Sequence, residues 1–219
     1  MRLIRDLLLA SSLGLAALPV VADAAKTITY TIDPTHTQVH FSWNHLGFSN
    51  PGAVFRDVTG TVIGNTAEPE KSSVQVTMPL TGLDSFVPLL NDHLLNSGDY
   101  FKPKEHPNVL FKSTGIRNVN RAKRTFTLDG ELTVNGITRP VSLNARANTI
   151  GEHPFYDKAP AAGFDATTVI KRSDFGMGKH VPMVSDELQV RITLEAVEAN
   201  AWRIAQEKQA AAAAAAERK

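Results

Sequence analysis

The chain has 219 residues, with 23 Lys and Arg against 22 Asp and Glu, and it contains no cysteine. A net charge this close to zero argues against nucleic-acid binding, which needs a basic face. The missing cysteines exclude a disulfide framework and a thiolate metal site. The length favours a single domain.

Residues 1–24 have the three parts of a secretory signal peptide. Arg2 and Arg5 form a basic start, residues 7–21 are an apolar run, and Ala22-Asp23-Ala24 is an A-x-A cleavage site. The run is short for a bilayer span and polar residues follow it, so we expect no transmembrane segment. We therefore expect a mature chain that starts near residue 25 and is exported to a bacterial periplasm or beyond.

Most of the mature chain alternates apolar and polar residues between turns. One apolar face per strand is typical of an antiparallel, half-buried sheet, whereas parallel strands are apolar throughout. We expect roughly eight or nine strands, because that many alternating runs can be separated. They lie near residues 28–33, 39–45, 54–63, 74–80, 109–111 and onward, 126–134, 141–147, 164–172 and 188–196.

One hairpin can be predicted in register. Asn135-Gly136 is the preferred pair for a two-residue type I′ turn. Strands that pair across this turn place Leu128 opposite Leu143, and both apolar stripes then fall on one face without a register shift. Pro140 has no N–H to donate, so we expect a sheet edge, a gap or a bulge beside it.

Two segments depart from the strand pattern. Residues 88–96 have apolar side chains at helical spacing and end at a Ser-Gly-Asp sequence, which predicts a short helix capping one end of a barrel. Residues 198–219 contain an unbroken alanine run at 210–216 and little apolar stripe. They predict a solvated helical or frayed tail, with a docking helix for a partner as the alternative.

Polar residues stand at two positions where an apolar stripe would otherwise continue. The apolar face of residues 39–45 reaches His45, and the apolar face of residues 164–172 reaches Arg172. Strand side chains repeat with period two, so both polar groups are expected to point the same way as their apolar neighbours. A filled core has no use for such groups, whereas the mouth of a ligand cavity does.

Several sequence blocks, in order and at these spacings, resemble the YceI-like polyisoprenoid-binding proteins. This family comprises exported bacterial proteins with a lipocalin-like antiparallel barrel. The resemblance covers residues 29–196 and does not include the alanine-rich tail. The blocks are DPTH at 33–36, LNSGDYF at 95–101, FKS at 111–113, GELTVNGITRPV at 130–141, RSDFGM at 172–177 and SDE at 185–187.

The resemblance implies an all-β domain over residues 25–197, an antiparallel lipocalin-like barrel of about eight strands. It implies that a long isoprenoid lipid binds in an elongated apolar cavity, and it makes a homodimer plausible. A barrel of about eight strands can hold one small ligand. At about 0.3 kcal/mol per heavy atom, a chain of roughly 40 carbons would gain on the order of 12 kcal/mol without a polar contact.

Aromatic and aliphatic residues on the inward stripes are the candidates for the cavity wall, with ordinary core packing as the alternative for each of them. Two of these candidates are expected near the capping segment, namely Phe86 and Phe101. The other candidates are Phe41, Trp43, Phe111, Phe164, Ile170 and Phe175.

His45 and Arg172 are the headgroup candidates. An arginine presents a planar fork to a phosphate or a carbonyl, and a neutral histidine offers one donor and one acceptor. The alternatives are an ion pair of Arg172 with Asp174 at the rim and a hydrogen-bonded rim position for His45. No metal site is expected, because His36 and His40 lie roughly 13 Å apart along a strand, too far to share one zinc ion.

These patterns favour a non-enzymatic periplasmic carrier without a cofactor. The expected ligand is polyprenyl phosphate or an isoprenoid quinone, although a fatty acid or amide would suit the same wall. Two other functions stay open, namely an interaction protein with a filled β-core and a lipid-modifying enzyme. The second would need catalytic groups inside the cavity, where only His45 and Arg172 are expected.

Overall fold

The computed structural model describes residues 27–218, so the expected signal peptide lies outside the described residues. The strands are β1 (Thr27–Ile32), β2 (Gln38–Ser42), β3 (Gly52–Phe55), β4 (Thr59–Asn65), β5 (Ser73–Pro79), β6 (Leu83–Asp84), β7 (Asn108–Asn120), β8 (Thr125–Val134), β9 (Ile137–Glu152), β10 (Pro160–Lys171) and β11 (Glu187–Glu198). The helices are α1 (Pro88–Asn96) and α2 (Ala199–Ala216), with 3-10 turns η1 (Pro69–Lys71), η2 (Leu80–Gly82) and η3 (Arg172–Phe175).

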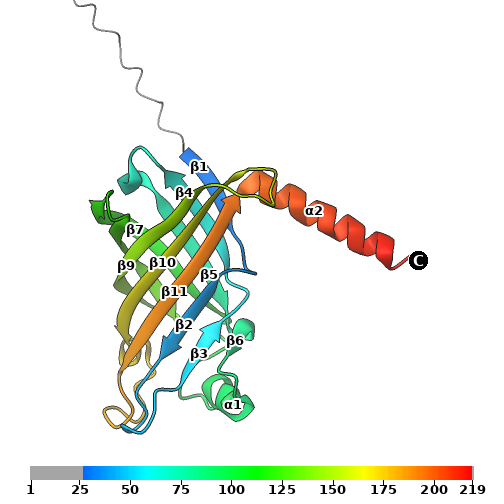
Figure 1. Ribbon diagram of the computed structural model, residues 1–219. Helices are drawn as coiled ribbons and strands as arrows, with labels where there is room; N and C mark the ends of the chain where they lie inside the picture. The colour runs from blue at the N-terminus through cyan, green and yellow to red at the C-terminus, as the bar shows by residue number, and fades with distance from the viewer. Residues whose placement is uncertain (1–26, 219) are drawn as a thin grey trace, which may run out of the picture.

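Eight strands form a closed antiparallel barrel, which confirms the predicted fold class. They follow the order β1-β4-β5-β7-β8-β9-β10-β11, and β1 then pairs with β11 to close the ring. The short strands β2, β3 and β6 continue from β11 and extend the wall (Figure 1). The helix α1 lies at the lower end of the barrel, and α2 projects away from the upper end (Figure 1). Neither of these two described helices could serve as a bilayer span.

The seam of the barrel is short and interrupted. β1 pairs with β11 over three residue pairs, from Tyr30 opposite Glu198 to Ile32 opposite Ala196. The chain then turns through residues 33–37, and β2 pairs with the same edge of β11 further down. β1 and β2 therefore pair with β11 like one strand that is interrupted at residues 33–37. At this interruption the backbone of β11 needs hydrogen-bond partners other than a strand.

Polar groups in this break connect it to β11. The Asp33 N–H donates to the Glu195 carbonyl at 2.9 Å, and the Thr37 hydroxyl accepts the Glu195 N–H at 3.1 Å. Asp33 and Thr37 are each 1% exposed, so these bonds are shielded from water. Buried polar groups are tolerated when they are paired in this way.

The register predicted for the β8–β9 hairpin is confirmed. Leu128 lies opposite Leu143 across the Asn-Gly turn. Pro140 pairs with Glu131 on β8 but lies beyond Asn144, where the pairing of β9 with β10 ends, so it lies at a gap in the ladder, one of the expected alternatives. The helix predicted over residues 88–96 is confirmed with the same bounds.

The prediction of one strand over residues 54–63 was wrong. The chain forms β3 and β4 instead, and between them Asp57 adopts a left-handed conformation with φ of 59°. Aspartate is among the residues that tolerate this region. Val58 directly after it is fully buried, which shows that the turn keeps apolar side chains directed inward across the break. The apolar–polar alternation of the sequence therefore continues through this turn, so the alternation alone could not predict the turn.

Asn135 closes the lower end of the barrel in addition to forming the hairpin turn. Its φ of 52° and the following Gly136 φ of 75° fit the type I′ geometry. Its side chain accepts the Lys102 N–H at 3.0 Å and donates to the carbonyls of Tyr100 at 2.8 Å and Phe175 at 3.3 Å. One buried amide thus joins the hairpin to two loops at the floor of the barrel.

Asn135→Gly is expected to lower the free energy of unfolding by about 1–3 kcal/mol, because glycine keeps the turn but removes the bonds to both loops. The matched control is Asn118→Gly. Asn118 also has a positive φ, but its side chain makes only an exposed hydrogen bond to Thr127. Urea unfolding of the two variants measures the difference. Equal losses would show that the Asn135 amide does not stabilise the floor.

Candidate functional site

The barrel encloses a cavity of about 520 Å³. Its wall consists mainly of the inward apolar side chains of the barrel strands, among them Val62, Val76, Leu128, Leu143, Val190 and Ile192. The size lies within the range of roughly 300–1,000 Å³ that is typical of ligand pockets. The interior is therefore not filled by side chains alone.

Small side chains on two neighbouring strands leave this space. Ala145 on β9 lies opposite Ala166 on β10, and both line the cavity. Ala147 and Ala162 line it further toward the upper end. Larger aliphatic residues at these inward positions would occupy volume that the alanines leave open. The inward side chains thus leave an open lumen, because several of them are alanines.

The cavity opens at one end. Its wall is buried along most of the barrel, but six lining residues are exposed, and these residues come from the ends of β4, β7, β8 and β9. They are Thr66, Asn120, Arg121, Arg124, Asn148 and Ile150. At the opposite end the lining residues Phe101, Val134 and Met177 are buried. The upper end in Figure 1 is therefore the mouth, and the end near α1 is the floor.

Five of the eight predicted wall residues line the cavity, namely Phe41, Phe101, Phe111, Phe164 and Ile170. The other three differ from the expectation. Trp43 stacks on Phe41 with ring centroids 5.9 Å apart and packs against the core without lining the cavity. Phe175 is 1% exposed within the core, and Phe86 is 74% exposed on the surface before α1.

His45 and Arg172 do not line the cavity. The strands that were expected to carry them inward end too early, since β2 ends at Ser42 and β10 ends at Lys171. His45 is exposed in the turn after β2, where its backbone bridges Ser49 and Val184. The period-two alternation of side chains therefore ends before either residue.

Arg172 instead holds together the loop that precedes β11. Its side chain is 4% exposed, and Nε donates to the Ser185 carbonyl at 2.9 Å while Nη2 donates to the Val184 carbonyl at 3.0 Å. Nη1 donates to the Met177 carbonyl. The guanidinium therefore donates to backbone carbonyls and not to the side chain of Asp174, and it lies beside Met177 at the floor of the barrel.

Arg172→Met is expected to lower the free energy of unfolding by about 2–4 kcal/mol, because methionine fills similar space but leaves three carbonyls without their donor. Lys171→Met is the matched control, since Lys171 is the exposed neighbour in the sequence. Urea unfolding measures the stability of both variants. An Arg172 variant of normal stability with an altered choice between phosphorylated and neutral lipids would contradict this assignment.

Two charged residues at the mouth, Arg121 and Arg124, were not among the predicted site residues. Arg121 and Arg124 come from the turn between β7 and β8, and both line the cavity where it opens. Arg121 Nη2 donates to the Ala67 carbonyl at 2.7 Å and Arg124 Nη1 donates to the Asn148 carbonyl at 2.7 Å. The signal was the sequence RAKR between two predicted strands, which places basic residues at one end of the barrel.

Two other ionisable residues line the cavity, Tyr30 and Asp165. Burial raises the pKa of the Tyr30 phenol, which is therefore neutral at physiological pH. Asp165 lines the cavity close to the irregular step between β9 and β10. The described lining residues include no histidine, lysine or glutamate. The wall is thus apolar along its length, with its cationic groups at the mouth.

A closed antiparallel barrel around a ligand-sized cavity is the architecture of lipocalin-like proteins. The family profile described as the YceI-like domain matches residues 30–196, and the chain belongs to this family. A UPF0312 protein of Azotobacter vinelandii is 34% identical over 197 residues, which cover 89% of this chain and 99% of that protein.

Solved structures have the same fold. The YCEI protein of Campylobacter jejuni superposes with a TM-score of 0.63 at 25% identity, covering 71% of this chain and 89% of that chain. A polyisoprenoid binding domain from Saccharophagus degradans has a TM-score of 0.54 at 13% identity, covering 78% of this chain and 99% of that chain. The barrel is therefore shared across sequences that have diverged widely.

Proposed function

We propose that the protein is a periplasmic carrier that holds an isoprenoid lipid, either polyprenyl phosphate or an isoprenoid quinone, inside the barrel. The observation that supports this most is the apolar cavity of about 520 Å³ with one open end. A linear apolar chain can enter such a cavity lengthwise and keep its polar end at the mouth.

The energetics of the wall support a long apolar ligand. Each methylene-sized unit that leaves water contributes about 0.8 kcal/mol. After the costs of association, about 0.3 kcal/mol per heavy atom remains for a ligand of this size. Affinity would therefore grow with the length of chain inside the barrel, and no hydrogen bond along the wall is required.

The composition of the wall supports binding rather than catalysis. A lipid-modifying enzyme needs a nucleophile or an acid–base pair beside the reacting atoms. Among the described lining residues Asp165 is the one carboxylate, and histidine, lysine and glutamate do not occur. The ligand class is supported by the S. degradans relative, which is described as a polyisoprenoid binding domain. Export is supported by the signal-peptide pattern of residues 1–24.

The arginines at the mouth favour a ligand with an anionic or carbonyl-bearing headgroup. Arg121 and Arg124 are both exposed there, and the bonds to Ala67 and Asn148 use only part of their N–H groups. Each guanidinium has five donors, so several remain for a phosphate or a quinone oxygen. In this proposal the headgroup sits at the mouth, at the opposite end from His45 and Arg172.

Ala145→Phe tests whether the lipid occupies the lumen. The larger side chain would project into the cavity at mid-wall, so we expect roughly tenfold weaker isoprenoid binding or more. Asn144→Phe is the matched control, because its side chain is exposed on the outer face of the same strand. Binding of a fluorescent isoprenoid analogue to both variants, with circular dichroism to confirm folding, gives the comparison. A folded Ala145 variant that binds normally would contradict occupancy of the lumen.

Replacing Arg121 and Arg124 together with Gln tests the headgroup. We expect a preference for polyprenyl phosphate over the neutral polyprenol to fall by roughly tenfold, since two charge-assisted contacts are lost. Lys123→Gln removes a charge from the same turn at a residue that does not line the cavity, and it serves as the control. The readout is a competition assay between the two lipids. An unchanged ratio in the double variant would remove the arginines from the headgroup site.

A further inference from the structure

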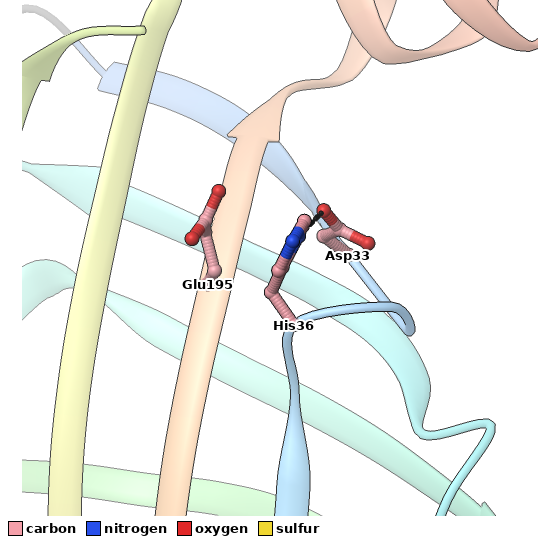
Figure 2. Close-up of side chains that lie close together, drawn as sticks. All are labelled: Asp33, His36 and Glu195. Atoms are coloured by element: carbon pink, nitrogen blue, oxygen red, sulfur yellow. Dashed lines mark hydrogen bonds and ion pairs between the residues drawn. The ribbon is translucent and has the colours of Figure 1, made fainter.

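Three potential metal ligands meet on the outer face of the barrel seam. Asp33 follows β1, His36 lies in the turn before β2, and Glu195 lies on β11 (Figure 2). One ligand atom from each residue lies within 4.8 Å of a ligand atom of the other two. Leu194 lines the cavity, so Glu195 beside it points to the opposite, outer face. The cluster is therefore separate from the lipid cavity.

Asp33 and His36 are held in a defined protonation state. The two residues are bonded through Oδ2 and Nδ1 at 2.7 Å, while the Thr35 N–H and hydroxyl donate to Oδ1. Burial alone would raise the pKa of Asp33, but the bonds from Thr35 and His36 lower it below its usual value. The ionised carboxylate can only accept, so His36 Nδ1 is the donor.

Glu195 is oriented by a second histidine. The Phe155 N–H donates to His153 Nδ1 at 3.2 Å, so Nδ1 is the acceptor and Nε2 carries the ring N–H. Nε2 then donates to Glu195 Oε1 at 3.0 Å. In metal sites, a hydrogen-bond partner outside the ligand set commonly fixes the direction of a ligating carboxylate in this way. His153 is therefore a positioning residue for Glu195.

A pocket of about 320 Å³ lies beside the cluster and has the charge that a cation requires. It is lined by His36, Glu152, His153 and Glu195, among others, and the described lining residues include no lysine or arginine. Its carboxylates thus lack a cationic partner within the pocket. His36 is 65% exposed and Glu195 33% exposed at their side chains, so a dissolved ion can reach both.

The ligand types select the class of ion. Ca²⁺ and Mg²⁺ take oxygen ligands, whereas zinc and similar transition metals combine imidazole nitrogen with carboxylate oxygen. With bonds of about 2.1 Å, zinc ligands lie at most about 4.2 Å apart. The three ligand atoms lie within 4.8 Å of one another, and rotation of the exposed His36 side chain would bring it to bonding distance.

We propose that Asp33, His36 and Glu195 bind one divalent transition-metal ion of the zinc type. The ion takes the place of the hydrogen bond between Asp33 and His36, and the neutral imidazole then carries its one proton on Nε2 while Nδ1 binds the ion. Three protein ligands leave one coordination position for water. The ion would link the break between β1 and β2 to β11, so its binding would stabilise the closed barrel. The proposal is independent of the lipid in the cavity.

Titration of the full mature protein with ZnCl₂ in an isothermal calorimeter tests this site. We expect saturable binding of one ion per chain and a higher melting temperature with zinc. His36→Gln and Glu195→Gln should each weaken binding by roughly tenfold or more, and His153→Gln should weaken it through loss of orientation. His40→Gln is the control, because His40 is a surface histidine of β2 bonded to Gln38.

Circular dichroism of each metal-free variant separates lost binding from lost folding. Wild-type protein that takes up no zinc would overturn the proposal. Equal affinity in the Glu195 and His40 variants would also overturn it, since the ion would then bind at another place. Neither of these outcomes would change the result of the lipid-binding assay. The metal site and the lipid-carrier function are therefore tested independently.

Discussion

The cavity depends on the pairing of β1 with β11. That contact comprises three residue pairs, yet it converts an open antiparallel sheet into a closed ring. One edge of β11 also pairs with β2, so the chain between the two strands must leave the edge and return to it. The buried Asp33 and Thr37 satisfy the backbone groups of β11 that this break would otherwise leave unpaired. A small polar structure at the seam therefore keeps a large apolar interior closed.

The closed ring explains why the two faces of the same strands differ in chemistry. Side chains alternate across the wall, so Leu194 meets the cavity while Glu195 meets solvent and the polar seam. Inside, alanines on β9 and β10 leave a lumen, and arginines of the β7–β8 turn stand at its mouth. The floor is closed by buried residues and by the Asn135 amide. In the proposed function, a ligand would have one direction of entry and one place for its polar end.

Local periodicity predicted much of the fold and part of the site. The β8–β9 register and α1 followed from alternation, turn chemistry or helical spacing, and five of the eight predicted wall residues lie at the cavity. The errors arose where strands end, because pairing with a neighbour decides whether a strand continues to His45 or Arg172. The seam cluster could not be predicted, since Glu195 reaches His36 through long-range pairing. The arginines of the mouth were visible in sequence but needed the barrel to give them a position.

Extraction of the natively exported protein, followed by mass spectrometry of the released small molecules, tests the central claim most directly. If the barrel carries an isoprenoid, the extract holds that lipid in roughly equal amount to the protein, and its end group identifies what the mouth recognises. A folded protein that releases no lipid and also fails to take up added isoprenoids is not an isoprenoid carrier. The cavity would then not be a lipid site.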